Sequence, residues 1–308
     1  MKTQIIGLDI GRGYVKAFSV YEGRTYQTIF NSVVGTGRDG IDYSNFENPI
    51  NLEINDDQFF FGELAIKESY NKVSNIKDEK TTDTAEKLLI AALSQVAVAE
   101  NVKIMLGVPN RLYRKQTRAN VIEKYKNMSY IIKDKVAEKV KKIHIADVDI
   151  FRESDSALIY LERGKVNKSP IALVSIGYKT TEISYYEPNF RFIDRNSTSL
   201  ALGQTDINVE VRRKLERERI YKDVAEIDIS SNYDDKKRIG YEMVSNRLYE
   251  EIDGIFTNIN EMEKIYVCGG TSQNLELDDS IFTKVENPQM ATAKGLFFVG
   301  NRRFNMEE

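Results

Sequence analysis

Two reactive side chains are almost missing from this 308-residue sequence, which contains one cysteine and one histidine. A single thiol, Cys268, cannot form a disulfide within the chain, and this suits a reducing cytoplasm. A single imidazole, His144, argues against a histidine-based metal site and against Ser-His-Asp hydrolysis. Any catalysis must therefore rely on carboxylates, lysines and backbone groups.

Long apolar runs and a strong net charge are also missing. The apolar stretch after Lys2 is interrupted by Asp9, and no later stretch is long enough to cross a bilayer. We therefore expect no signal peptide and no membrane contact. The formal net charge of −3 provides no overall attraction to nucleic acid. Direct nucleic-acid binding is not expected.

The apolar residues are numerous enough for a large core, because 41% of the chain is hydrophobic, with 17 Tyr and 14 Phe. The length predicts two domains, or one large domain with a cleft. Strand and helix patterns alternate, which predicts an α/β fold class. The clearest expected strands are 4–10, 14–21, 102–108, 171–176, 181–186 and 264–268, and the clearest expected helices are 85–100, 155–163 and 289–299.

Two of these helices have expected N-terminal caps. Asp83 or Thr84 is expected to cap helix 85–100, and Ser154 to cap helix 155–163. The stretch 88–93 is apolar on almost every side, which predicts burial against a sheet.

The first strand ends in a glycine turn with phosphate-binding chemistry. Asp9 closes the strand, Gly11 and Gly13 form the turn, and Lys16 follows in the next strand. Glycines allow a ligand to approach exposed amides, and a carboxylate can hold a hydrated divalent cation. The sequence is not a Walker loop, and the turn leads into a strand. Taken alone, the pattern fits a simple hairpin better.

The same pattern occurs twice. Residues 5–11 align with 171–177, and residues 14–20 align with 180–186. A duplicated α/β domain would place the two turns across a cleft. The copies differ at one position, because Ser175 stands where the first copy has Asp9.

These motifs resemble those of the actin, Hsp70 and sugar-kinase superfamily, and within it bacterial actin-like proteins of the ParM/StbA type. Asp9, Gly11, Gly13 and Lys16 are similar to the first phosphate motif. The second phosphate motif, the adenosine motif and the Asn-Pro-Gln-x-Ala-x-x-x-Gly signature of plasmid actins are matched by residues 175–182, 267–272 and 287–295.

The resemblance implies two actin-like (ribonuclease H-like) domains around a nucleotide cleft. The first would comprise residues 1–152 with 285–308, and the second 153–284 with a small insertion near 218–240. It also implies ATP or ADP with Mg²⁺ as cofactors, with GTP as the alternative nucleotide.

Individual site residues follow from the same resemblance. Asp9 would hold the metal through water, and Glu153 would position the attacking water. The nucleotide would be bound by Gly11, Arg12, Gly13, Lys16, Ser175, Gly177, Tyr178, Lys179, Thr180, Gly269, Gly270 and Thr271. Without the resemblance, the preferred interpretation of Glu153 is an acid favoured at a helix N-terminus by the helix dipole. The family usually has aspartate at the position of Ser175, so we expect slower or altered hydrolysis; a neutral replacement is the alternative.

The expected function is that of a cytoplasmic ATPase that polymerises into filaments and segregates plasmid or similar DNA. The resemblance implies self-association and a DNA-bound adaptor protein of the ParR type. Two alternatives stay open: a slow or non-hydrolysing actin-fold scaffold, and a small-molecule kinase of the same superfamily.

Overall fold

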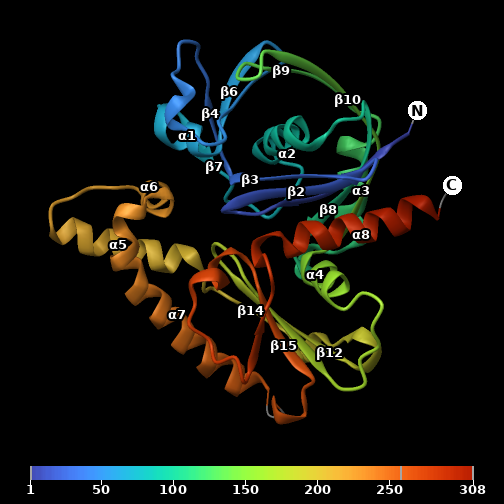
Figure 1. Ribbon diagram of the computed structural model, residues 1–308, viewed down its shortest axis with the longest axis vertical. Helices are drawn as coiled ribbons and strands as arrows, with labels where there is room; N and C mark the ends of the chain where they lie inside the picture. The colour runs from blue at the N-terminus through green and yellow to red at the C-terminus, as the bar shows by residue number, and fades with distance from the viewer. Residues whose placement is uncertain (1, 257–258, 307–308) are drawn as a thin grey trace. The chain divides into compact units, whose positions relative to one another are not determined.

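The computed structural model describes residues 2–256 and 259–306, which form two compact units (Figure 1). The first unit contains residues 1–160 and 292–308, and the second contains residues 161–291. Residues 1, 257–258 and 307–308, which the predicted domains include, lie outside the described residues. No helix within the described ranges is long and apolar enough to span a membrane.

The first unit is built on one ten-stranded sheet, with the order β3-β2-β1-β8-β10-β9-β5-β6-β4-β7. Its strand β1 is buried along its whole length, and it pairs antiparallel with β2 and parallel with β8. The strands are β1 (Gln4–Ile10), β2 (Tyr14–Tyr21), β3 (Arg24–Asn31), β4 (Val33–Thr36), β5 (Ile50–Ile54), β6 (Asp57–Phe61), β7 (Lys72–Ser74), β8 (Asn101–Val108), β9 (Ser129–Asp134) and β10 (Lys139–Arg152).

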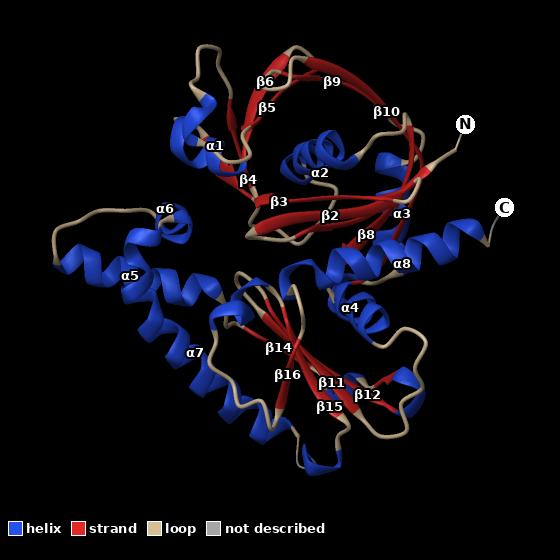
Figure 2. Ribbon diagram, in the orientation of Figure 1, coloured by secondary structure: helices blue, strands red, loops and turns tan. Residues whose placement is uncertain are grey.

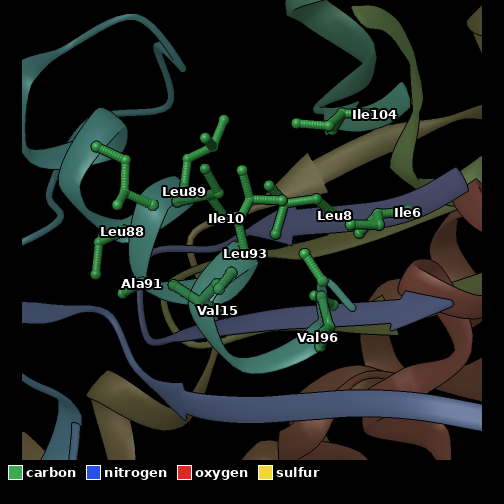
Figure 3. Packing of buried hydrophobic residues seen from close by; sticks show 14 of the residues in the cluster. Ile6, Leu8, Ile10, Val15, Leu88, Leu89, Ala91, Leu93, Val96 and Ile104 are labelled. Carbon is green, nitrogen blue, oxygen red and sulfur yellow. The ribbon is translucent and has the colours of Figure 1, made fainter. Parts of the chain in front are cut away.

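Helix α2 (Asp83–Val96) is the centre of this unit's core. It lies inside the curve of the sheet, where it contacts β1, β2, β3, β4 and β9 (Figure 2). Its buried side chains pack against those of β1, and Figure 3 labels Leu88, Leu89 and Leu93 near Ile10. The predicted burial of this helix is confirmed. Its cap is Thr82, whose hydroxyl accepts from the Ala85 amide at 3.1 Å, and not Asp83 or Thr84.

Four further helices complete the first unit: α1 (Gly62–Glu68), α3 (Lys115–Tyr125), α4 (Glu153–Leu161) and α8 (Ala291–Asn305). Helix α4 begins two residues before the predicted 155, so Ser154 lies inside it and not at its cap. The Ser154 hydroxyl instead donates to Asn110 Oδ1 at 2.9 Å.

Helix α8 packs closely against α4 in the first unit. A Cβ on Gly295 would overlap the carbonyl oxygen of Ser156, so only glycine permits this approach. The predicted division assigned 153–160 to the second domain, whereas these residues group with the first unit. In sequence, the two compact units divide between Tyr160 and Leu161, near the end of α4, and the predicted domain division stays a prediction.

The second unit contains a six-stranded sheet with the order β13-β12-β11-β15-β16, and β14 pairs with β12. Its core lies between β11 and β12 and the helices α5 and α7. The elements are β11 (Ile171–Ile176), β12 (Thr181–Glu187), β13 (Arg191–Phe192), β14 (Thr198–Leu200), β15 (Lys264–Cys268), β16 (Phe282–Lys284), α5 (Gln204–Arg217), α6 (Val224–Ile229) and α7 (Asp234–Ile255). The segment expected as an insertion holds α6 and the start of α7.

The two units repeat one arrangement. Strand β11 pairs antiparallel with β12 and parallel with β15, as β1 does with β2 and β8. The predicted duplicated α/β fold is confirmed.

Candidate functional site

The first predicted phosphate turn is a tight hairpin between β1 and β2. The Gly11 amide donates to the Tyr14 carbonyl at 3.0 Å, and a Cβ on Gly11 would lie 2.8 Å from that oxygen. The Gly11 carbonyl accepts from Ser32 Oγ at 2.6 Å and from Asn75 Nδ2 at 3.2 Å. The surrounding loops therefore fix the shape of the turn.

The predicted metal-binding carboxylate and the predicted phosphate-binding lysine contact each other. Asp9 and Lys16 are directly opposed in the β1–β2 register, so their side chains share one face of the sheet. Lys16 Nζ lies 2.8 Å from Asp9 Oδ2, and Asp9 is only 5% exposed. The carboxylate is thus held in place by a charge-assisted hydrogen bond.

Glu153 lies beside this pair, at the first residue of α4. A Cβ on Gly107, in β8, would lie 3.0 Å from Glu153 Cγ, so the glycine makes room for the side chain. Burial raises the pKa of Glu153, Lys80 lowers it, Asp9 raises it and Lys16 lowers it, with a net rise. The sequence placed Asp9, Lys16 and Glu153 in one site, and the structure brings all three together.

Lys80 is a site residue that the sequence analysis missed. Its Nζ donates to the Ile10 carbonyl at 2.7 Å and lies 3.2 Å from Glu153 Oε1. The residue is 73 positions from Glu153 and belongs to no motif. Only its place just before the cap of α2 could have drawn attention to it.

Arg12, predicted to bind nucleotide, contacts a carboxylate of its own unit. Its Nε donates to Asp78 Oδ1 at 2.7 Å, and Arg111 also pairs with Asp78. Burial raises the pKa of Asp78, but hydrogen bonds from Arg12 and Arg111 outweigh it and hold that pKa below its usual range. In this structure the Arg12 side chain fastens the turn to the segment before Lys80. A role for Arg12 in nucleotide binding stays a prediction.

The second turn reproduces the first in its hydrogen bonding. The Gly177 amide donates to the Thr180 carbonyl at 2.9 Å. The Gly177 carbonyl accepts from Thr271 Oγ1 at 2.9 Å, and the Tyr178 carbonyl accepts from the Thr205 amide at 2.7 Å. Thr271 and the start of α5 therefore fix this turn. Thr180 and Lys179 are half-buried within it.

Ser175 has a carboxylate opposite it. In the β11–β12 register, Ser175 is paired with Glu182, at the place where the first unit pairs Asp9 with Lys16. The second hairpin therefore has a hydroxyl in place of the carboxylate and a carboxylate in place of the lysine. The position of the negative charge differs between the two copies.

The predicted adenosine motif packs against the Asn-Pro-Gln segment. Gly269 has φ = +92°, and its amide donates to the Pro288 carbonyl at 3.0 Å. The Gln289 side chain approaches Gly270, because a Cβ there would lie 3.1 Å from Gln289 Nε2. The side chain of Tyr178 is half-buried, and burial raises its pKa, as does the negative charge of Asp228.

The residues of the first unit fit a hydrated magnesium ion better than a protein-ligated metal. No three histidine, cysteine, aspartate or glutamate side chains converge on a metal position in the described part of the chain. Mg²⁺ commonly retains several waters and binds one or two carboxylates together with substrate phosphates. In the first unit, Asp9 would be the carboxylate that holds the hydrated Mg²⁺.

Comparisons with known proteins agree with this architecture. The family model "Actin like proteins N terminal domain" matches residues 7–154. No curated protein matches the sequence significantly. Three similar solved structures cover almost the whole chain: an archaeal actin homologue, Ta0583 (TM-score 0.79, 18% identity, 97% of this chain and 100% of that chain), a 15-stranded ParM filament from Clostridium botulinum (0.79, 20%, 98% and 100%), and Bacillus thuringiensis ParM with ATP (0.71, 15%, 99% and 100%).

The duplicated fold is similar to that of solved actin-like proteins. Residues 7–154 match the actin-like N-terminal domain, and the whole chain shares the fold of ParM, so the predicted resemblance to actin-like proteins of the ParM/Alp type is confirmed.

Proposed function

We propose that this protein is an ATPase that assembles into nucleotide-dependent filaments and segregates plasmid or similar DNA. The observation that carries the proposal is the convergence of Asp9, Lys16 and Glu153 beside the amides of the Gly11 turn. Solved relatives add support, because one is a ParM filament, one is ParM with ATP and one is the archaeal homologue in complex with ADP.

Each of the three site residues of the first unit has a defined task in this proposal. Asp9 holds Mg²⁺ through water, and Lys16 with the turn amides binds phosphate oxygens. Glu153 accepts a hydrogen bond from the attacking water and orients it. When bound, Mg²⁺ neutralises phosphate charge. Phosphoryl transfer to water needs mainly such positioning and charge neutralisation, so no further nucleophile is required.

The second unit contributes further phosphate and nucleoside contacts in the same proposal. The turn residues Ser175, Gly177, Tyr178, Lys179 and Thr180 bind phosphates. Gly269, Gly270 and Thr271 line the adenosine. Backbone contacts of this kind distinguish the two purine rings poorly, so GTP is a competitor to test.

A filament needs a link to its DNA cargo. The net charge of −3 provides no general affinity for DNA, so we propose a DNA-bound adaptor of the ParR type as the partner, acting in the cytoplasm.

One observation favours a second candidate, a slow or non-hydrolysing filament scaffold. Ser175 lacks the charge that the family's aspartate supplies at this position. In such a scaffold ATP would be a structural ligand and filaments would persist. The third reading, a small-molecule kinase, would require an acceptor hydroxyl and would form no filament.

Sedimentation of the purified protein with ATP and Mg²⁺, with phosphate release followed in parallel, separates these functions. Filaments that release phosphate support the proposed ATPase. Filaments without release support the scaffold. Protein that stays in the supernatant at all nucleotide concentrations would contradict both the filament ATPase and the filament scaffold.

A further inference from the structure

Lys80 is a lysine in an unusual place. Its side chain is 3% exposed, although lysine seldom lies buried without partners. It sits between Asp78, which Arg12 and Arg111 hold, and the α2 cap Thr82. Its own carbonyl accepts a hydrogen bond from Tyr125 Oη. The backbone around Lys80 is therefore fixed from both sides.

The ammonium group joins two functional segments. One contact is to the Ile10 carbonyl, at the last residue of β1 and the entry to the phosphate turn. The other is to Glu153, at the first residue of α4. Both acceptors are protein atoms, and the second of them is the Glu153 carboxylate.

The charges around Glu153 alternate in sign. Lys80 faces it from the segment before α2, Asp9 from β1 and Lys16 from β2. The uncharged Gly107 of β8 also lies against the Glu153 side chain, and Leu296 of α8 packs on that glycine. Lys80 is thus the cation in contact with Glu153, while Lys16 is paired with Asp9.

We propose that Lys80 is the positioning residue for Glu153, holding its carboxylate ionised and aimed at the water-binding position beside the phosphate turn. This inference rests on the proposed function of Glu153. A carboxylate in a desolvated site that loses its cation takes up a proton, and the protonated group is a poorer acceptor for water.

The test is Lys80→Met in the full chain, which keeps the length of the side chain and removes its charge. The acid limb of the pH profile for phosphate release should move to higher pH by about one unit, because a neighbouring cation shifts a carboxyl by that order. The KM for ATP should stay within about twofold, since Lys80 acts through Glu153. An unmoved acid limb would overturn the proposal.

Lys141→Met is the matched control. Lys141 is half-buried and, like Lys80, its ammonium group donates to backbone carbonyls, in this case those of Ser94 and Ala97. It has no contact with Glu153 among the described hydrogen bonds and ion pairs. Its replacement should leave the pH profile unchanged.

A second readout does not depend on hydrolysis. The ¹³C-carboxyl titration of Glu153, assigned by its loss in Glu153→Gln, should shift upward in Lys80→Met without nucleotide. If the wild type released no phosphate, the proposed function would fail while this titration still decided the role of Lys80. Should Lys80→Met not fold, the double variant Lys80→Met/Glu153→Gln should fold, because no unpaired charge remains. Failure of both would make Lys80 a packing residue and contradict the inference.

Discussion

Gly11 and Gly177 hold the same place in two hairpins of one chain. Each amide donates to the carbonyl three residues later, over 3.0 Å from Gly11 and 2.9 Å from Gly177. The two turns therefore share a backbone geometry and differ in chemistry, because the residue two positions earlier is Asp9 in one and Ser175 in the other.

The first prediction concerns that difference. Ser175→Asp should raise the rate of phosphate release about tenfold and make it more dependent on Mg²⁺, equivalent to about 1.4 kcal/mol of barrier. The added carboxylate would act on metal-bound water. Ser175→Asn is the control, since it has a similar size and no charge. Equal rates and equal Mg²⁺ dependence in all three proteins would show that Ser175 is a neutral replacement.

A second prediction concerns the pair of Asp9 and Lys16. Asp9→Asn leaves a largely buried lysine without its anion, so the free energy of unfolding should fall by about 3 kcal/mol. Adding Lys16→Met should recover much of that loss but not Mg²⁺-dependent nucleotide binding. Urea unfolding and titration with a fluorescent nucleotide measure the two effects.

Lys67 and Glu63, which form an exposed ion pair one turn apart in α1, provide the comparison. Lys67→Met should lower the free energy of unfolding by less than about 1 kcal/mol, because exposed ion pairs contribute little. A similar cost for Asp9→Asn would contradict the structural importance assigned to the buried pair.

A third prediction tests the contact between α8 and α4. Gly295→Ala should lower the free energy of unfolding by about 1–3 kcal/mol, because the new methyl group overlaps the Ser156 carbonyl. Gly254→Ala, in α7, meets nothing within 4 Å and should stabilise by about 0.5–1 kcal/mol. Thermal unfolding of both variants compares them directly. Two variants of equal stability would contradict the close packing of these helices.

A fourth prediction concerns pH. Burial raises the pKa of Asp149, but hydrogen bonds from Arg118 and Arg303 hold it below the usual value. A carboxyl with a lowered folded-state pKa stabilises the fold above its unfolded pKa, about 3.9, and loses this contribution as the pH falls through the folded value. The stability gap between the wild type and Asp149→Asn should therefore narrow below about pH 4. Urea unfolding from pH 6 to pH 3 measures this difference in the free energy of unfolding. A difference that stays constant over that range would contradict the prediction.

Local patterns were sufficient for much of the fold and for part of the site. The apolar run of β1, the glycines after it and the repeat at residues 171–177 are local signals, and they located both hairpins. The all-apolar stretch of α2 was likewise enough to predict its burial. Tertiary contacts were not predictable in this way. Lys80 meets Glu153 across 73 positions, and Gly295 packs on Ser156 although the two residues lie far apart in the sequence.

The most direct test follows light scattering and phosphate release together after ATP and Mg²⁺ are added to the wild type and to Glu153→Gln. Glu153→Gln should assemble with ATP, release phosphate at least about a hundredfold more slowly, and fail to disassemble. The wild type should assemble, release phosphate and then lose scattering. Phosphate release by Glu153→Gln at the wild-type rate would contradict the assignment of this site.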